Sequence, residues 1–427
     1  MNARGRARPT PQQASWQDLE TGLFCHFGMN TFYGKEWGDG TEDPGRFDPS
    51  AFDARQWVKA AQDAGFRYLI LTAKHHDGFC LWPTATTEHS VKASPWREGQ
   101  GDVVREVADA CAEAGLPFGL YLSPWDRHEP RYADKDAYDD LYCRQLTELL
   151  TGYGPLVEIW FDGAGSEGRS YDWPRIMALV EKHQPEAMTF NMGRPTIRWV
   201  GNEDGVAPYP CWNEADSARA SMFTKDMLAW LPDTPAWVPA ECDVPIREGR
   251  WFWHSGEEDR VKSLEQLLDI YYRSVGHGAN LLLNIAPDDH GLLPETDVNR
   301  ALELSKEIER RLSRSVAETD GAGRELLLEW NVPSAIDHAI IMERITEGER
   351  VTEYALDART PEGRWVRVSA GTAIGHKKID RFPAVTANGL RLTVAAATDT
   401  PLIRRLACFG AGDEKRIGRL DDEIAEA

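Results

Sequence analysis

The sequence lacks the cysteine patterns that mark disulfide scaffolds and zinc sites. Its seven cysteines are an odd number, and none belongs to a C-x-x-C pair. Such a set gives neither a disulfide framework nor a zinc signature. We therefore predict reduced thiols that are mostly buried.

Long apolar runs are also absent. No stretch approaches the length of a transmembrane helix. Arg4, Arg6 and Arg8 lie near the N-terminus, but the apolar segment of a secretory signal does not follow them. We expect a cytoplasmic protein with no membrane partner, unless a signal has been removed from the chain.

The chain has fewer basic than acidic residues. The chain carries 48 Lys and Arg against 69 Asp and Glu, and its formal net charge is −21. This balance argues against nucleic acids and anionic membranes as partners, because both repel an acidic surface. It fits a soluble protein that acts on a neutral small molecule. No pattern in the sequence indicates the oligomeric state.

Several catalytic motifs are missing as well. The chain has no G-x-S-x-G, no P-loop and no H-E-x-x-H, so lipase, NTPase and zinc-protease functions lack their motifs. No G-x-G-x-x-G follows the first predicted strand, which removes the fingerprint of a dinucleotide-binding fold. We expect no cofactor.

Tryptophan, by contrast, is abundant. The chain has 16 Trp among 427 residues, and 42% of its residues are hydrophobic. Some of these indoles fill the core of a large domain. Others can stack on the apolar C–H face of a pyranose ring, so this abundance favours a carbohydrate site.

Strand-like and helix-like segments alternate over residues 16–317. Apolar runs of strand length occupy residues 23–28, 68–72, 117–122, 156–161, 187–191 and 280–285. Amphipathic helices are predicted at residues 53–64, 102–115, 136–150, 173–183, 264–275 and 296–312. This alternation predicts an α/β protein with a parallel sheet, closed as a (β/α)₈ TIM-like barrel.

The remaining segments flank or interrupt this pattern. Residues 1–15 are polar, and we expect them to be disordered. Residues 206–262 look irregular and rich in Pro and Trp, with one short strand at 236–238.

Composition changes near residue 318, where a polar linker over residues 318–324 precedes strand-like runs without helices. We predict a small antiparallel β-sandwich over residues 318–410 and a loose, charged tail over residues 411–427.

One stretch stands out within the barrel region. Residues 156–161 form an apolar strand that ends in Asp162 and Gly163. Ligands of α/β folds bind outside the carboxyl ends of the strands, so Asp162 is placed for chemistry. The alternative is an Asp that merely caps the next turn. Further candidates follow other strand ends: His26, Glu36, Trp37, His75, His76, Tyr121, Trp125, Glu203, Trp251 and His254.

Residues 197–205 form another short β run that ends in an acid and a glycine, so Glu203 and Asp162 lie at the ends of different strands. Two carboxyl groups with unlike pKa values can cleave a glycosidic bond. The short Asp suits a nucleophile, and the longer Glu suits a proton donor. Four other glutamates compete for the acid role: Glu36, Glu158, Glu214 and Glu241.

The adjacent His75 and His76 invite a metal hypothesis. Neighbouring side chains on a strand point to opposite faces, however, so we expect no metal site there.

Five segments resemble glycoside hydrolase family 29, the retaining α-L-fucosidases, and occur in that family's order. They are residues 26–28 (HFG), 36–37 (EW), 75–79 (HHDGF), 160–163 (WFDG) and 280–285 (NLLLNI). The resemblance covers the barrel from about residue 15 to residue 315. Residues 372–377 are similar to part of the family's accessory β-sandwich.

The resemblance implies a role for each matching residue. Asp162 matches the nucleophile. His26, Glu36, Trp37, His75, His76 and Tyr121 match fucose-binding positions. Residues 199–203 (WVGNE) and 123–128 (SPWDRH), which contain Glu203 and Trp125, resemble the branch specific for α-1,3/1,4-linked fucose. In that branch Glu203 would be the acid/base. Trp251 and His254 are added as aromatic and polar groups of the Trp-rich loop.

The implied function is a retaining exo-α-L-fucosidase that acts on Lewis-type branched oligosaccharides by double displacement. Three alternatives stay open. They are a broad-specificity α-L-fucosidase, an enzyme for another α-linked sugar such as galactose, and a catalytically inactive fucose-binding protein.

Overall fold

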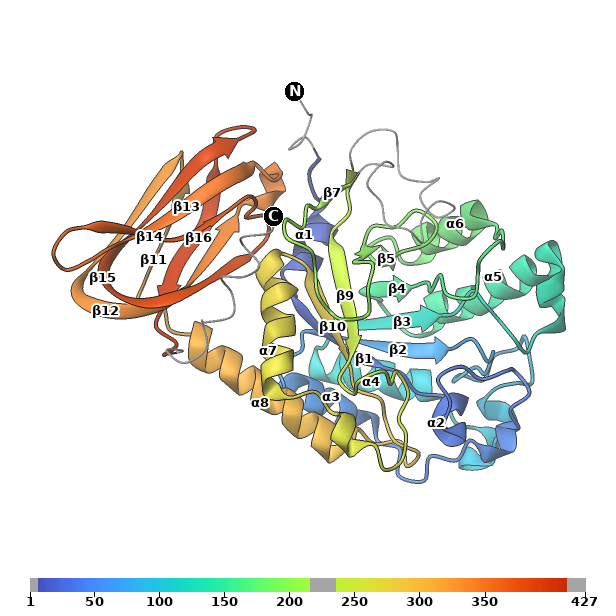
Figure 1. The fold of residues 1–427 in the computed structure, drawn as a ribbon. Helices are drawn as coiled ribbons and strands as arrows, with labels where there is room; N and C mark the ends of the chain where they lie inside the picture. The colour runs from blue at the N-terminus through green and yellow to red at the C-terminus, as the bar shows by residue number, and fades with distance from the viewer. Residues whose placement is uncertain (1–6, 216–235, 413–427) are drawn as a thin grey trace.

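The computed structural model describes residues 7–215 and 236–412, which form a barrel followed by a sandwich of strands (Figure 1). The barrel strands are β1 (Thr21–Cys25), β2 (Tyr68–Lys74), β3 (Phe118–Leu122), β4 (Glu158–Trp160), β5 (Met188–Phe190), β6 (Arg198–Trp199), β9 (Ala240–Pro245) and β10 (Asn280–Asn284). They are parallel and follow one another in chain order, with β1 paired to β10. A bridge from Phe190 to Ile197 brings the two sheet edges together. The predicted TIM-like barrel is confirmed.

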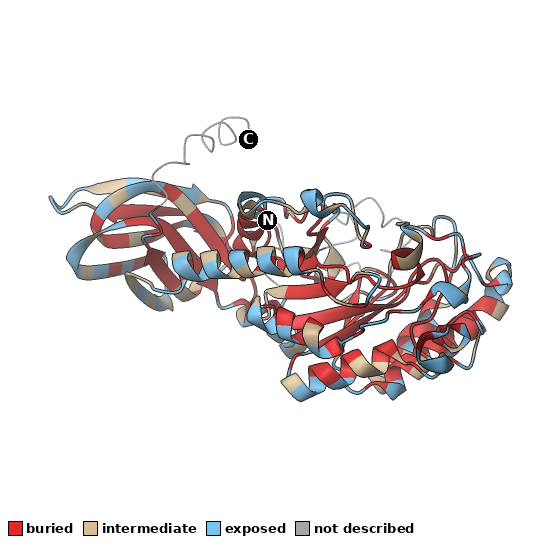
Figure 2. Ribbon diagram, turned by 90° about the horizontal axis from the view of Figure 1, so that it is seen from below, coloured by how far each residue is buried: buried red, intermediate tan, exposed pale blue. Residues whose placement is uncertain are grey.

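Helices cover the outside of the barrel and bury one face each, as the colours of Figure 2 show. They are α3 (Ala54–Asp63), α4 (Val103–Ala114), α5 (Lys135–Gly152), α6 (Trp173–His183), α7 (Leu264–Arg273) and α8 (Glu295–Leu312). Polar side chains cap their first turns: the Asp53 side chain accepts the Arg55 amide, and Ser263 and Gln266 form a capping box. Residues 191–197 join β5 to β6 without a helix.

Two predictions for the barrel region are wrong. Residues 11–15, expected to be disordered, form most of α1 (Pro11–Gln17), because Thr10 and Gln13 cap it and Trp16 is buried inside the barrel. Residues 1–6 lie outside the described residues. The segment 206–262 is not irregular throughout, since it contains β9. Its Glu241 and Asp243 interrupt the apolar pattern by which a buried strand is recognised.

The sandwich consists of β11 (Ala317–Ala322), β12 (Glu325–Glu343), β13 (Val351–Arg359), β14 (Trp365–Gly371), β15 (Lys378–Ala397) and β16 (Leu402–Phe409). All pair antiparallel. β12 and β15 have 19 and 20 residues, so each is long enough to contribute to both layers. The predicted β-sandwich is confirmed.

The sandwich begins and ends differently from the prediction. The polar segment 318–324 is not a linker, because most of it forms the edge strand β11, on which intermediate and exposed side chains alternate. Of the predicted loose tail, Ala411 and Gly412 donate their amides to the Asp337 carboxylate. Residues 413–427 lie outside the described residues.

The sandwich packs directly against the barrel. Five of its apolar side chains join the core cluster of the barrel: Ile340, Met342, Ile379, Ala407 and Phe409. Polar contacts add to this interface, since His376 and Arg404 both bond Asp18 at 2.9 Å. All seven cysteines are buried and free, as predicted. Among the helices of residues 7–215 and 236–412, none has the length and apolarity that a membrane crossing requires.

Candidate active site

A cavity of about 180 Å³ lies at the carboxyl ends of the barrel strands. Most of the predicted site residues line it: His26, Glu36, Trp37, His75, His76, Asp162, Glu203 and Trp251. Tyr121, Trp125 and His254 are not among the lining residues, but each contacts one of them. The structure therefore brings together side chains that come from widely separated parts of the sequence.

Asp162 follows β4 and is held in place by two hydrogen bonds. The Tyr121 hydroxyl donates to its Oδ2 at 3.0 Å, and the Ala164 amide donates to its Oδ1 at 2.8 Å. Burial raises the pKa of this carboxyl, while both bonds lower it. The side chain is still 25% exposed. Asp162 is thus oriented by the protein and open to the cavity, as a nucleophile must be.

Glu203 follows β6 and faces the same cavity. The Trp251 indole donates to its Oε2 at 3.1 Å. Burial raises the pKa of Glu203, and the negative charges of Asp162 and Glu36 raise it further, whereas the Trp251 bond lowers it. A carboxyl whose pKa is raised in this way keeps its proton longer, which suits a general acid.

Three of the four other glutamates that could have been the acid lie away from the cavity. Glu158 and Glu241 are buried inside the barrel, where Trp16 donates to Glu158 and both Tyr68 and Trp160 donate to Glu241. Glu214 accepts the Ala7 amide, and it is not among the residues that line the cavity.

Glu36 does line the cavity, but its carboxylate is already occupied. Its Oε2 accepts the amides of Trp251 and Phe252, and its Oε1 lies 2.8 Å from His254 Nε2. A carboxylate that collects donors in this way suits an acceptor for sugar hydroxyls rather than a proton donor.

His75 and His76 lie past the end of β2, and their rings are 4.1 Å apart. Both line the cavity, so the expectation that they point to opposite faces is wrong. The alternation of side chains applies within a strand, and β2 ends at Lys74. Within the described ranges, no group of three or more His, Cys, Asp and Glu side chains is placed to hold a metal ion.

Burial keeps the pocket histidines uncharged. It lowers the pKa of His26 and of His76 to about 3 and the pKa of His75 well below its usual range. Neutral imidazoles carry one donor and one acceptor nitrogen each, which suits them to hydroxyl groups.

Aromatic rings form the rim. The Trp37 side chain is 51% exposed, which is unusual for a Trp, and its ring lies 5.4 Å from that of Trp125. Trp125 also contacts His76 at 5.0 Å, and the Arg127 guanidinium lies 5.1 Å from its ring. Such a rim offers flat apolar faces beside the cavity.

Sequence reasoning missed several lining residues: Phe24, Trp160, Phe190, Asn191, Trp199 and Asp243. Trp160 stacks on Phe190 at 3.9 Å and on Tyr121 at 5.5 Å, so it supports the residue that orients Asp162. Its position in the strand, two residues before Asp162, could have indicated that it lies near the site. Asp243 lies on β9, which the sequence pattern did not reveal.

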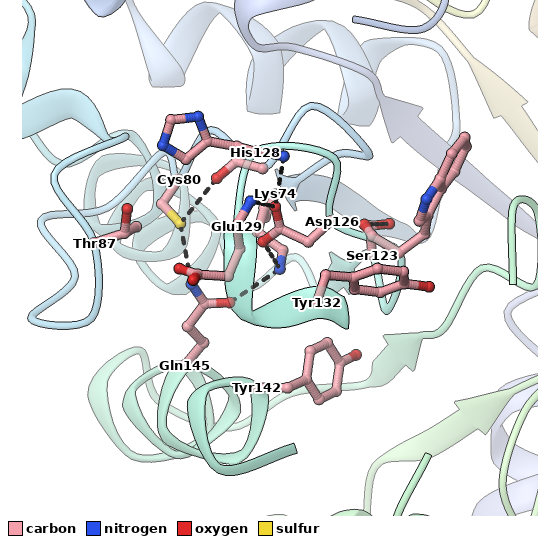
Figure 3. Close-up of polar contacts among 12 residues, drawn as sticks. Lys74, Cys80, Thr87, Ser123, Asp126, His128, Glu129, Tyr132, Tyr142 and Gln145 are labelled. Atoms are coloured by element: carbon pink, nitrogen blue, oxygen red, sulfur yellow. Dashed lines mark hydrogen bonds and ion pairs between the residues drawn. The ribbon is translucent and has the colours of Figure 1, made fainter. Parts of the chain in front are cut away.

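A buried polar cluster connects the loops that follow β2 and β3 (Figure 3). Lys74 Nζ donates to Asp126 Oδ2 and to Gln145 Oε1, both at 3.0 Å. The Lys74 and Asp126 side chains are 0% and 3% exposed. Asp126 also accepts the His128 amide at 3.1 Å. This ion pair ties the segment that carries Trp125 to the segment that carries His75 and His76.

Comparison with known proteins gives one consistent family. A family model described as Alpha-L-fucosidase matches residues 41–310. Alpha-L-fucosidase 1 of Arabidopsis thaliana is 39% identical over an alignment of 446 positions, gaps included, which covers 94% of this chain and 87% of that protein.

Solved structures give the same answer. A glycoside hydrolase 29 family member from an unknown rumen bacterium has a TM-score of 0.89 and 38% identity, covering 97% of this chain and 79% of that one. A glycoside hydrolase 29 fucosidase of Ruminococcus gnavus, in complex with fucose, has a TM-score of 0.86 and 29% identity, covering 97% of each chain.

Proposed function

The chain belongs to the α-L-fucosidase family, glycoside hydrolase family 29, and on this premise we propose that it releases α-1,3/1,4-linked L-fucose from Lewis-type oligosaccharides with retention of configuration. It is a glycoside hydrolase, and its substrate is a small carbohydrate. The observation that carries the proposed mechanism is that Asp162 and Glu203 line one cavity from the ends of different strands.

The proposed reaction has two steps. Asp162 attacks the anomeric carbon, and the bond to the leaving oxygen breaks as that oxygen takes the proton of Glu203. Glu203, now a carboxylate, then removes a proton from water. The resulting hydroxide attacks the anomeric carbon, displaces Asp162 and frees fucose. Each carboxyl group ends in the state in which it began.

The charges of the site support this order of events. The Asp162 charge is one cause of the raised pKa of Glu203, so an ionised Asp162 helps Glu203 to stay protonated. When Asp162 becomes an ester, that charge disappears. The pKa of Glu203 then falls, and the same residue can act as a base.

The proposed linkage preference rests on two features. The segment 199–203 resembles the branch of the family specific for α-1,3/1,4-linked fucose. In addition, the exposed Trp37 and the half-buried Trp125 next to it form an aromatic rim beside the cavity, where a second sugar such as galactose could stack. Contacts with a remote sugar can raise turnover by positioning the reacting bond.

Two measurements test the proposal. In the first, ¹H NMR follows the anomer of fucose released from an aryl fucoside. Retention predicts that α-fucose appears first, and β-fucose as the first product would contradict the double displacement. In the second, initial rates are compared on Lewis a trisaccharide and 2′-fucosyllactose. Faster hydrolysis of 2′-fucosyllactose would overturn the linkage preference alone.

The acid role is tested with Glu203→Ala. A sugar hydroxyl leaves poorly without a proton, whereas an activated aryl group leaves with little help. We expect a loss of about 10²–10⁴-fold on Lewis a trisaccharide and a much smaller loss of glycosyl-enzyme formation from an aryl fucoside. An equal proportional loss on both substrates would move the acid role to Glu36, the other glutamate among the described residues that line the cavity.

A further inference from the structure

We infer that the three cavity histidines differ in which ring nitrogen carries the proton, and that three buried polar neighbours fix this choice. They are Asn30 for His75, Asn284 for His26 and Ser123 for His76. The cavity then presents one imidazole N–H, from His75, and two unprotonated ring nitrogens, from His26 and His76. The consequence for substrate recognition rests on the proposed function, whereas the assignment of protons does not.

The Asn284 amide sets the proton of His26. Its Nδ2 lies 2.9 Å from the Trp251 carbonyl oxygen, which can only accept, so the orientation of the amide is fixed. Its Oδ1 therefore faces His26 and accepts the His26 backbone amide at 3.2 Å. The same Oδ1 lies 2.9 Å from the His26 ring Nδ1. Nδ1 must be the protonated nitrogen, and Nε2 is left as an acceptor.

The Asn30 amide has the opposite effect on His75. Its Nδ2 donates to the Glu36 carbonyl oxygen at 3.1 Å, which again fixes the orientation of the amide. The same Nδ2 lies 3.2 Å from His75 Nδ1. Since Nδ2 can only donate, His75 Nδ1 accepts and its proton is on Nε2. His75 thus offers a donor where the other two rings offer acceptors.

Ser123 sets the proton of His76. Its hydroxyl oxygen lies 2.7 Å from the Trp125 carbonyl oxygen, so its single hydrogen is used there. The oxygen must then accept from His76 Nδ1, also at 2.7 Å. His76 Nε2 is left unprotonated, 3.6 Å from Asp162 Oδ2. That separation is too long for a hydrogen bond, as expected when two acceptors face each other.

The three assignments give the cavity a fixed polarity. A sugar hydroxyl that meets His26 or His76 must donate its proton, while one that meets His75 must accept. Burial lowers the pKa of all three rings, so they stay neutral near pH 7 and each keeps one donor and one acceptor nitrogen. We therefore regard Asn30, Asn284 and Ser123 as positioning residues that act on the substrate through the histidines.

The tautomers can be read without substrate. Long-range ¹H–¹⁵N spectra of the full chain labelled with ¹⁵N-histidine distinguish protonated from bare ring nitrogens, and His75→Gln identifies the His75 signals. We expect protonated Nε2 in His75 of the wild type. Asn30→Asp replaces the donor with an acceptor of equal size, so the His75 proton should move to Nδ1.

A matched variant controls for the added carboxylate. Asn284→Asp also places a carboxylate beside a cavity histidine, but it keeps the acceptor, so His26 should retain protonated Nδ1. In Asn30→Asp the value of kcat/KM on an aryl fucoside should fall by about 10- to 100-fold, because one buried hydrogen bond to substrate is lost. Should Asn30→Asp not fold, Ser123→Ala replaces it, and the His76 proton should move to Nε2, facing Asp162.

The outcomes separate the two claims. A wild-type His75 that carries its proton on Nδ1, or an unchanged His75 in Asn30→Asp, would overturn the inference. If the spectra show the inferred tautomers while the wild type releases no fucose, the inference stands and the proposed function fails.

Discussion

At the scale of single residues, the proposed chemistry depends first on Asp162. Replacing it by Gly removes the attacking carboxylate and leaves a small space facing the cavity. We predict that Asp162→Gly abolishes turnover of an aryl fucoside without unfolding the protein. Azide should partly restore turnover and give β-fucosyl azide, because the anion attacks from the vacated face.

Product analysis by NMR and a thermal melt complete this test. An unchanged melt excludes unfolding as the cause of lost activity. Turnover at the wild-type rate without azide would remove Asp162 from the nucleophile role.

A second residue-scale prediction concerns the pH dependence of catalysis. The Trp251 indole donates to Glu203, and this bond lowers the pKa of the acid because it stabilises the ionised form. Trp251→Phe removes the bond, so the pKa of Glu203 should rise. Glu203 acts first as a protonated acid, and activity is lost as pH rises through its pKa. The alkaline limb of kcat/KM should therefore move to higher pH.

Trp37→Phe is the matched control for this experiment. It also replaces a cavity Trp by Phe, but Trp37 contacts His76 and Trp125 rather than Glu203. Its alkaline limb should stay in place even if KM changes. An alkaline limb that moves to lower pH in Trp251→Phe, or moves equally in both variants, would contradict the assignment of that limb to Glu203.

The sequence placed Asp162 and Glu203 after strand ends, and the structure brings them to one cavity. The sequence could not show which carboxyl group is placed to act as the acid, because the depth of each group in the barrel depends on strand register. Glu241 and Asp243 show the difficulty. They lie two residues apart on β9, yet Asp243 lines the cavity while Glu241 is bonded to Tyr68 and Trp160 inside the barrel. The tautomers of the histidines likewise depend on neighbours distant in the chain.

At the scale of elements, the loop after β4 determines how Trp125 is held. Gly165 has φ +70°, and a Cβ at this position would lie 1.9 Å from Trp125 Cε3. Gly165→Ala must therefore push the indole aside. We predict that KM for Lewis a trisaccharide rises about 3- to 10-fold, because the rim loses a stacking surface. An aryl fucoside lacks the second sugar, and its KM should change less.

Gly168 provides a control in the same loop. Its φ is +74°, and apart from Gly168 itself and its two chain neighbours no residue has an atom within 4 Å of a Cβ built there. Gly168→Ala thus carries the same backbone strain, about 1–2 kcal/mol, without the collision. If both variants raise KM for the trisaccharide equally, backbone strain rather than the position of Trp125 is the cause.

Elements with a clear periodic pattern were predicted well, as α4 and β2 show. The elements that were missed have polar sequences for physical reasons. β9 carries acids that face the inside of the barrel, and β11 is an edge strand that keeps polar side chains in solvent. A local hydrophobic pattern reports which side chains of a segment are exposed to water. Strand prediction from this pattern therefore fails where buried polar groups are compensated by hydrogen bonds, and where a strand has only one neighbour.

At the scale of the whole molecule, the sandwich and the barrel share a core. Ile379 of the sandwich is buried against Gly276 of the barrel. A Cβ built at Gly276 would lie only 3.2 Å from the Cβ of Ile379, so the two backbones approach closely here. The Tyr272 hydroxyl and His338 Nε2, 2.9 Å apart, add a buried polar contact between the two parts. Every described residue that lines the cavity, however, falls in the range from Phe24 to Trp251. The sandwich should therefore contribute to stability and not to the reacting site.

Truncation before β11 and the variant Ile379→Asp test this division of roles. Truncation should expose the apolar barrel surface and reduce solubility and thermal stability.

In the full chain, Ile379→Asp places a charge in the shared core, and calorimetry should show a melting temperature lower by roughly 5 °C or more. Val332→Asp is the control, because Val332 lies in the sandwich but is 73% exposed, and its melt should stay near wild type. At a temperature below both transitions, kcat/KM on an aryl fucoside should remain unchanged in Ile379→Asp, because the cavity belongs to the barrel. A soluble truncated barrel with wild-type stability would show that the shared core is dispensable, and a loss of kcat/KM in the folded Ile379→Asp variant would show that the sandwich influences the site.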